Sequence, residues 1–350
     1  MLALGLGLTY GLWQTNRMEA ERALNEEFQF WADKVAYGIA DRLDGYVQVL
    51  RGVVGLFDAS MSVSRDEFRR YVEALRLEDR CPGIQGVGFS VFVPADQKSE
   101  HVAVVRREGL PDYDIRPDGE RVFYAPVLYL EPFAGHDLRA FGYDMAVEPV
   151  RWEAAERARD QGLATLSGKL GPQEGATADS QAGSLMFQPV YRPGAPIETV
   201  ADRRANLLGW AYSPVCPREL VRNVLSRIDV GHRQSVLQVE IYDGDFVSQD
   251  NRLFALDPAI AEAGPHRGLE AVRRLEFGGR QWTLVVTASR QFEAHRPSDR
   301  ATLIALGGGV GSLLLALFVG VQALNQMRIS EALGESARVN QQLAEREREL

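Results

Sequence analysis

The feature that most constrains this chain is a stretch from residue 301 to 321 that holds no charged residue. A helix of that length, rising about 1.5 Å per residue, crosses the ~30 Å hydrocarbon core of a bilayer. Buried core helices usually keep a polar face, which this stretch lacks. It therefore predicts a transmembrane helix over 301–321. Gly307 and Gly311 within it predict a close contact with a second helix.

A second apolar stretch opens the chain over residues 1–13 and is short for a membrane span. A secretory signal is the alternative, although no Lys or Arg precedes the apolar residues. We interpret it as a first transmembrane helix whose beginning is missing. The segment between the two spans then lies in the periplasm or outside the cell, which gives a two-span protein of the inner (cell) membrane.

The composition excludes several functional classes. A net charge of −9 argues against a nucleic-acid binder, which usually carries a basic face. Two cysteines and five histidines leave no multi-cysteine zinc site, and no metal or cofactor is expected. The phosphate-binding loop, the HExxH zinc motif and the GxSxG nucleophile motif are absent from the sequence.

The predicted elements indicate an α+β fold. A long stalk helix covers 14–57, because its apolar residues recur every three or four positions. Ser64 and Glu67 fit a capping box that opens a second helix over 64–77. Further helices are predicted over 99–107, 149–161 and 218–228. Strands are predicted over 84–93, 122–130, 163–169, 184–192, 207–213, 236–242, 273–277 and 281–288, and loops over 172–183 and 193–206.

The charged segment after the apolar stretch, 322–350, predicts a cytoplasmic signalling helix. Ile329 and Leu343 share one heptad position, and Ala332 and Val339 share the other, which predicts the start of a coiled coil. Such a helix carries little function alone, and we expect an output domain beyond residue 350.

Several separated motifs in the middle of the chain resemble the CHASE domain. This domain is the extracellular sensor of bacterial histidine kinases and cyclases and of plant cytokinin receptors. The matching stretches are Pro82–Gly86, Tyr124–Val127, Glu131-Pro132, Gly142–Asp144, Arg151–Gly162 and Phe187–Arg192.

The resemblance implies a fold and a layout. It implies a stalk over 14–79, a membrane-distal PAS-like ligand-binding subdomain over 80–215 and a membrane-proximal PAS-like subdomain over 216–295. It also implies a homodimer, an extracytoplasmic loop between the spans, and a cytoplasmic kinase or diguanylate cyclase as output.

The same resemblance implies a binding site in the distal subdomain. Asp144 is similar to the aspartate that bonds the ligand in the plant receptors, and Leu166 to a leucine that forms an apolar wall. The alternatives are that Asp144 caps the helix beginning near Pro149 or braces the loop, and that Leu166 belongs to the core. From strand position, we expect further lining residues at Tyr124, Phe141, Met186 and Gln188.

The two cysteines depart from the family pattern. In a PAS-like sheet the first and last strands are antiparallel neighbours, so Cys81 would lie near Cys216. An oxidising compartment permits a bond between them. We predict a disulfide, with two independent buried thiols as the alternative.

These features predict a ligand sensor and not an enzyme. The chain would bind an unknown small molecule outside the cell and pass the signal through the second transmembrane helix. One alternative is a membrane-anchored module that binds a periplasmic protein. The other is a hydrolase, which requires His136 and Asp144 to converge with a serine such as Ser167.

Overall fold

A computed structural model describes residues 2–77, 84, 86–132, 140–171, 183–228, 237–256, 268–289, 292 and 298–349. The chain divides into two compact units. The central unit is Phe28–Phe292, and the terminal unit combines Met1–Glu27 with Glu293–Leu350.

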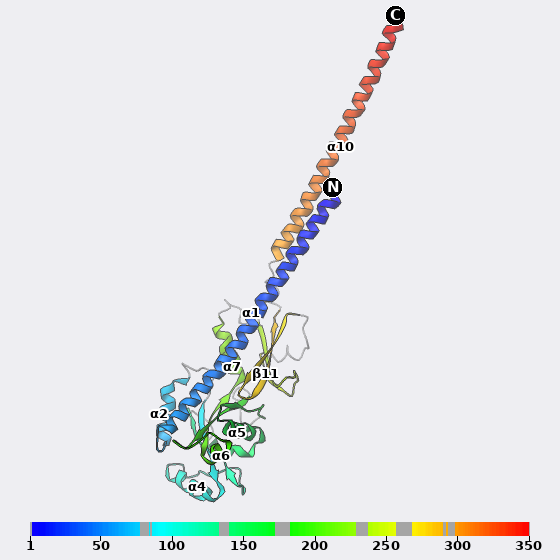
Figure 1. The fold of residues 1–350 in the computed structure, drawn as a ribbon. Coiled ribbons are helices and arrows are strands. Elements are labelled where there is room, and N and C mark those ends of the chain that lie inside the picture. Colours follow the sequence, from blue (N-terminus) through cyan, green and yellow to red (C-terminus); the bar gives the residue numbers. More distant parts are fainter. Residues whose placement is uncertain are drawn as a thin grey trace. The chain divides into compact units, whose positions relative to one another are not determined.

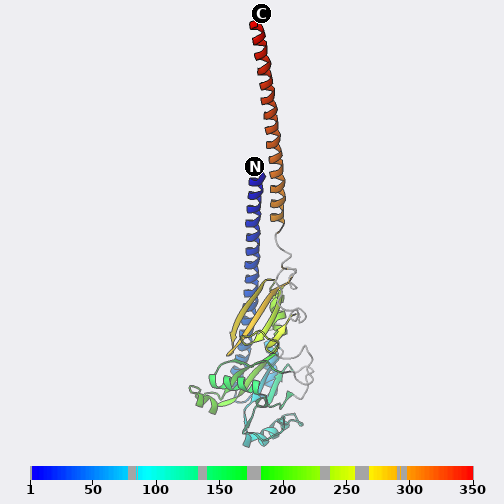
Figure 2. The same cartoon turned by 90° about the vertical axis from the view of Figure 1, so that its right-hand side faces the viewer.

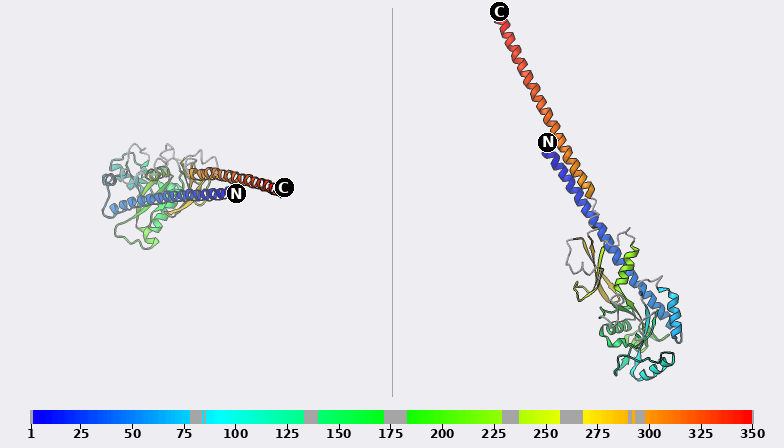
Figure 3. Two further views of the ribbon diagram at one scale, coloured as in Figure 1. Left: turned by 90° about the horizontal axis from the view of Figure 1, so that it is seen from above. Right: turned by 180° about the vertical axis from the view of Figure 1, so that it is seen from behind.

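The first helix, α1 (Leu2–Asp58), contributes to both units. Within the central unit its predicted apolar face is buried, and Phe28, Val35 and Ile39 are fully inaccessible to solvent. The next helix, α2 (Arg65–Leu75), begins at the predicted Ser64–Glu67 capping box. It lies beside the C-terminal end of α1 (Figures 1 and 3), where the Tyr71 hydroxyl reaches Gly52.

A five-stranded antiparallel sheet forms the first half of the central unit. Its strands lie in the order β4-β1-β7-β6-β5. The first and last strands of this sheet along the chain, β1 and β7, are therefore neighbours. The strands are β1 (Val87–Val91), β4 (Val127–Glu131), β5 (Thr165–Leu166), β6 (Ser184–Tyr191) and β7 (Leu207–Val215). A separate pair, β2 (Val93–Pro94) and β3 (Phe123–Tyr124), extends from it.

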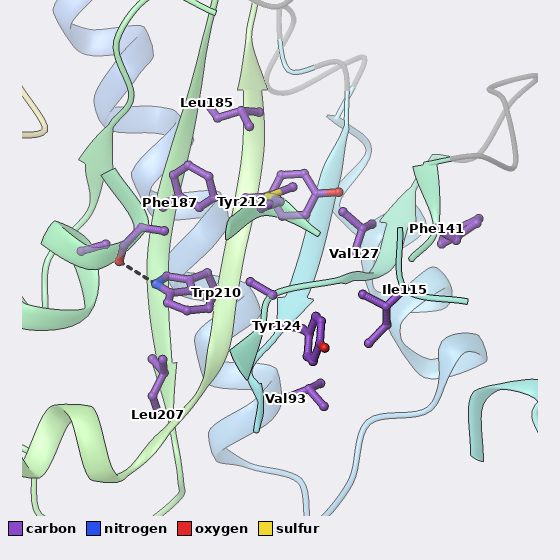
Figure 4. Packing of buried hydrophobic residues seen from close by; sticks show 14 of the residues in the cluster. Val93, Ile115, Tyr124, Val127, Phe141, Leu185, Phe187, Leu207, Trp210 and Tyr212 are labelled. Atoms are coloured by element: carbon purple, nitrogen blue, oxygen red, sulfur yellow. Dashed lines mark hydrogen bonds between the residues drawn. The ribbon is translucent and has the colours of Figure 1, made fainter. Parts of the chain in front are cut away.

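The two faces of this sheet are covered by different elements. One face carries Phe187, Trp210 and Tyr212, which pack with α5 (Pro149–Gln161) into a hydrophobic cluster (Figure 4). The Trp210 indole Nε1 donates to the Ala155 carbonyl of that helix at 2.8 Å. On the opposite face, Phe89 of β1 packs against Phe57 of α1. We call these the α5 face and the α1 face.

A four-stranded antiparallel sheet forms the second half, in the order β10-β11-β8-β9. Its strands are β8 (Leu237–Asp243), β9 (Arg252–Ala255), β10 (Glu270–Phe277) and β11 (Arg280–Ala288). The predicted Gly278-Gly279 hairpin turn joins β10 to β11, and both glycines have positive φ. Here too the first and last strands, β8 and β11, are paired. Helix α7 (Pro217–Arg227) links the two sheets.

The part of α1 that belongs to this unit, from Phe28 to its C-terminal end, contacts both halves (Figures 1 and 2). Phe57 stacks on Phe89 of the five-stranded sheet with ring centroids 4.2 Å apart. Asp33 accepts a hydrogen bond from Arg273 Nε of β10 at 2.5 Å. One helix therefore serves as a common support for both sheets.

Two elements differ from the sequence prediction. Part of the predicted loop 193–206 is a helix, α6 (Val200–Ala205), which begins at a second capping box formed by Thr199 and Asp202. Strand β9 was not predicted, because its four residues are too few to show an alternating pattern. The remaining described elements are α4 (Lys98–Arg107) and the short 3₁₀ turns η1 (Ala95–Gln97) and η3 (Met145–Val147).

The terminal unit contains the predicted apolar helix within α10 (Ser298–Glu349). Its segment Thr302–Arg338 is long and apolar enough, by length and composition, to cross a membrane. The N-terminal segment of α1 packs against it, since a β-carbon at Gly5 would lie 2.6 Å from Ser312 Oγ and Gly308 lies against Thr9. Gly307 and Gly311 have nothing within 4 Å of their β-carbon positions, so within this chain the close contact is made by Gly308 and Ser312.

Candidate functional site

Asp144 lies in a turn that is fastened to the edge of the five-stranded sheet. Gly142, with φ +80°, donates its N–H to the Val127 carbonyl at 2.9 Å. The Val127 N–H in turn donates to the Tyr143 carbonyl at 3.0 Å. Asp144 itself donates its N–H to Arg116 and forms a bridge with Pro126. Backbone hydrogen bonds therefore hold the turn on both sides, independently of the Asp144 carboxylate.

The Asp144 carboxylate is fully buried, and its two oxygens have different surroundings. Oδ1 accepts the backbone N–H of Ala125 at 2.8 Å and that of Ala146 at 3.1 Å. Oδ2 lies 3.4 Å from Arg121 Nη1 and has no hydrogen-bond partner among the described residues. The bracing alternative therefore accounts for Oδ1, whereas the helix that begins at Pro149 is capped by Glu148 and not by Asp144. Oδ2 keeps an unused capacity to accept a hydrogen bond.

Arg121 reaches Asp144 because Tyr124 holds its loop. The buried Tyr124 hydroxyl donates to the Gly119 carbonyl at 2.9 Å and accepts the Arg121 N–H at 3.2 Å. The Arg121 guanidinium also lies over the Tyr124 ring, 5.6 Å from its centroid, and Lys98 Nζ lies 4.8 Å from the same centroid. The predicted residue Tyr124 thus belongs to the surroundings of Asp144, through its contacts with Arg121.

Phe141 is also near this turn, three residues before Asp144, and belongs to the cluster on the α5 face. The Arg65 guanidinium lies 4.8 Å from its ring centroid, and Arg116 donates to its carbonyl at 2.9 Å. Burial lowers the pKa of Arg65 below its ordinary value. The cation thus lies over this ring. Figure 4 shows Phe141 at the margin of the cluster.

The other predicted lining residues lie on the opposite face of the sheet. Leu166 pairs with Met186, and Gln188 follows two residues later on the same strand, so all three share the α1 face. Leu166 is on β5, at the opposite edge of the sheet from β4 and the Asp144 turn. The structure thus does not bring these three residues together with Asp144, and their contact with a ligand stays a prediction.

The predicted disulfide involves a residue outside the described part of the chain, Cys81. Its proposed partner Cys216 is buried. Ile84 forms an antiparallel bridge with Val215, as expected for adjacent first and last strands. The pairing of the two cysteines stays a prediction.

The residues of the hydrolase alternative are separated. Ser167 follows β5, whereas Asp144 bridges to Pro126 beside β4, at the other edge of the sheet. The Ser167 hydroxyl already donates to Gly168 and accepts the Leu185 N–H at 2.8 Å. His136 lies outside the described residues. Among the described residues no cluster of His, Cys, Asp or Glu has the arrangement of a metal site.

Sequence reasoning missed the arginines at this site. Arg121 faces the buried carboxylate and Arg65 covers Phe141. Arg121 lies in no motif, and the capping box around Arg65 predicts the start of a helix but not the contact of this side chain with Phe141. Such a contact depends on how the loop folds back, which a local pattern does not determine.

The structure is thus an α+β unit with a buried carboxylate, in a chain whose last described helix contains a segment long and apolar enough to cross a membrane. The CHASE domain family model matches residues 61–254, more than half of the chain. The chain therefore belongs to the CHASE domain family, a sensor domain of membrane signalling proteins. No curated protein matches the chain.

Proposed function

We propose that this chain is the extracytoplasmic sensor region of a two-span membrane receptor, and that it binds a small molecule at Asp144. The observation that carries the proposal is Asp144 Oδ2, a fully buried carboxylate oxygen without a hydrogen-bond partner among the described residues. Buried polar atoms are rarely left in this state, because each one costs free energy. A ligand that donates an N–H or O–H to Oδ2 would remove that cost.

Arg121 is the group that a ligand would meet first at this oxygen. Its side chain is 25% exposed, whereas that of Asp144 is fully buried. The ligand either takes the place of the guanidinium or inserts between the two charged groups and bonds to both. A hydrogen bond to a charged group contributes about 1.5–3 kcal/mol, and apolar contacts of the ligand with the surrounding cluster would supply further affinity.

The two sheets support a PAS-like interpretation of both halves. In each sheet the first and last strands in the chain are antiparallel neighbours, which is the arrangement expected of a PAS-like sheet. We infer that the five-stranded half is the ligand-binding subdomain and the four-stranded half the membrane-proximal one. We keep the boundaries 80–215 and 216–295 for these two subdomains as part of the proposal.

The packing of two helices in the terminal unit supports two spans. Gly5 and Thr9 of α1 approach Ser312 and Gly308 of α10, and small residues of this kind permit close contact of membrane helices. The receptor would then work as a homodimer and drive a cytoplasmic kinase or cyclase beyond residue 350. No enzymatic activity is proposed for residues 1–350.

The binding proposal is tested on the full chain in detergent micelles with a library of small metabolites, by thermal shift. Asp144→Asn keeps an oxygen for the Ala125 and Ala146 amides and replaces the acceptor at Oδ2 by a donor. We expect at least one compound to raise the unfolding temperature of the wild type and to lose this effect in Asp144→Asn. Asp66→Asn, which removes an exposed carboxylate paired with Arg69, is the matched control and should keep the effect.

Two results would contradict the proposal. One is that no compound shifts the wild-type protein. The other is that compounds bind equally well to the wild type and to Asp144→Asn, which would place the site elsewhere. A wild type that is stabilised only by a periplasmic protein extract would favour the protein-binding alternative.

A further inference from the structure

The two sheets of the central unit meet where β5 faces the turn of the β10–β11 hairpin. β5 is the edge strand of the five-stranded sheet, and the Leu166 N–H and carbonyl are free of the ladder with β6. The N–H donates to the Gly278 carbonyl at 2.9 Å. The carbonyl accepts Arg157 Nη2 of α5 at 2.8 Å. The backbone of Leu166 is thus fixed by one group from the hairpin and one from α5.

Two glycines permit this approach. Gly278 has φ +56° and Gly279 has φ +70°, which form the tight turn. A β-carbon at position 278 would lie 2.7 Å from the Leu166 nitrogen, and one at position 279 would lie 3.1 Å from Arg157 Nε. The turn therefore needs glycine both for its backbone conformation and for its contact with β5 and α5.

An ion pair fixes the start of β11 beside this contact. Arg280 donates to the two Asp243 oxygens at 2.9 and 2.7 Å. Asp243 Oδ2 also accepts the backbone N–H of Lys169, which follows β5, at 3.1 Å. The hairpin is thereby joined to β8 and to the segment after β5.

The same contact is connected to the Asp144 site through α5. Asp144 Oδ1 accepts the Ala146 N–H at the start of η3, and α5 begins at Pro149 two residues after η3 ends. Ala154, Ala155 and Ala158 of α5 are almost fully buried against the sheet. Because close-packed side chains transmit displacement, a shift at the start of α5 moves Arg157, about two turns further along the helix.

We propose that α5 and the Gly278-Gly279 turn form a link that carries a change at Asp144 to the β10–β11 hairpin, the last sheet element before α10. The inference rests on the proposed function in one respect, because it is the proposed ligand that would produce the change at Asp144. The link itself is a property of the fold. Leu166 then acts through its backbone at this link, which gives it a role different from the ligand-binding wall implied by the resemblance.

The test measures amide hydrogen exchange by mass spectrometry in the full chain without any ligand, so its outcome is independent of the binding proposal. Asp144→Ala removes the acceptor of the Ala125 and Ala146 amides. We expect it to speed exchange about fivefold in peptides from α5, β5 and the 275–283 hairpin, the factor for loss of about 1 kcal/mol. Arg157→Gln removes the guanidinium contacts with Leu166 and the Gly279 region without changing the backbone of the turn.

The decisive comparison is the double variant. In the Arg157→Gln background, Asp144→Ala should still speed exchange in α5 but change the hairpin by less than about twofold. Gly278→Ala is expected to act like Arg157→Gln. Gly194→Ala is its control, because Gly194 has φ +68° and nothing lies within 4 Å of its β-carbon position.

Three results would overturn the link. In the first, Asp144→Ala leaves hairpin exchange unchanged in the wild-type background. In the second, its effect on the hairpin persists undiminished with Arg157→Gln, as global destabilisation would produce. In the third, Gly278→Ala and Gly194→Ala behave alike.

Discussion

Gly142 lies directly against the backbone carbonyl of Asp114, so that a β-carbon at position 142 would overlap that oxygen. Its φ of +80° is unfavourable for any residue with a side chain. Both effects act on the turn that carries Asp144. We predict that Gly142→Ala lowers the free energy of unfolding by about 3 kcal/mol, since the backbone strain alone costs on the order of 1–3 kcal/mol. Urea unfolding of the full chain measures the change.

Gly109→Ala is the matched control for this prediction. Gly109 has φ +106°, but nothing lies within 4 Å of its β-carbon position, so only the backbone strain remains. We expect a loss of about 1 kcal/mol there. Equal losses in the two variants would mean that contact with Asp114 contributes nothing.

The Arg280–Asp243 ion pair is expected to stabilise the four-stranded sheet measurably. The Asp243 side chain is only 9% exposed, and both of its oxygens accept from Arg280. Asp243→Asn should lower the free energy of unfolding by about 2 kcal/mol, because it leaves the guanidinium without its charged partner. The exposed pair Arg274–Asp245, at 3.9 Å, gives the control: Asp245→Asn should cost less than about 0.5 kcal/mol. Similar losses in the two variants would contradict the prediction.

Much of this fold could be predicted from local sequence patterns. The 3.6-residue spacing of apolar residues identified α1, the Ser64–Glu67 capping box identified the start of α2, and Gly278-Gly279 identified the hairpin. Each of these signals acts between residues close in the chain. Short elements such as β9 gave no such signal.

The composition of the site depended on contacts that local patterns do not contain. Asp144 and Tyr124 were predicted near one another, and Arg121 connects them. Leu166, Met186 and Gln188 were expected at the same site, but the strand register puts them on the other face. A shift of one residue in register exchanges the faces of a strand, so residues of neighbouring strands cannot be grouped without the pairing itself.

Protonation of His101 is expected to make the stability of the central unit depend on pH. It lies on α4, and its Nε2 is 3.0 Å from the Tyr113 hydroxyl. Burial lowers the pKa of His101 to about 4 and raises the pKa of Tyr113. The tyrosine therefore keeps its proton, and its hydroxyl shares a hydrogen bond with a neutral imidazole whose tautomer decides which of the two groups donates.

Because the folded-state pKa of His101 is below its unfolded value near 6.5, the unfolded chain takes up a proton first as the pH falls. The contribution of His101 is thus fully present above pH 6.5 and decreases between about pH 6.5 and 4. Between pH 7.5 and 5.0 the wild type should lose about 2 kcal/mol more than His101→Gln, which keeps a neutral acceptor for Tyr113 but does not titrate. Urea unfolding at the two pH values measures this difference, and parallel losses in the two proteins would show that the imidazole is protonated as easily in the folded state as in the unfolded chain.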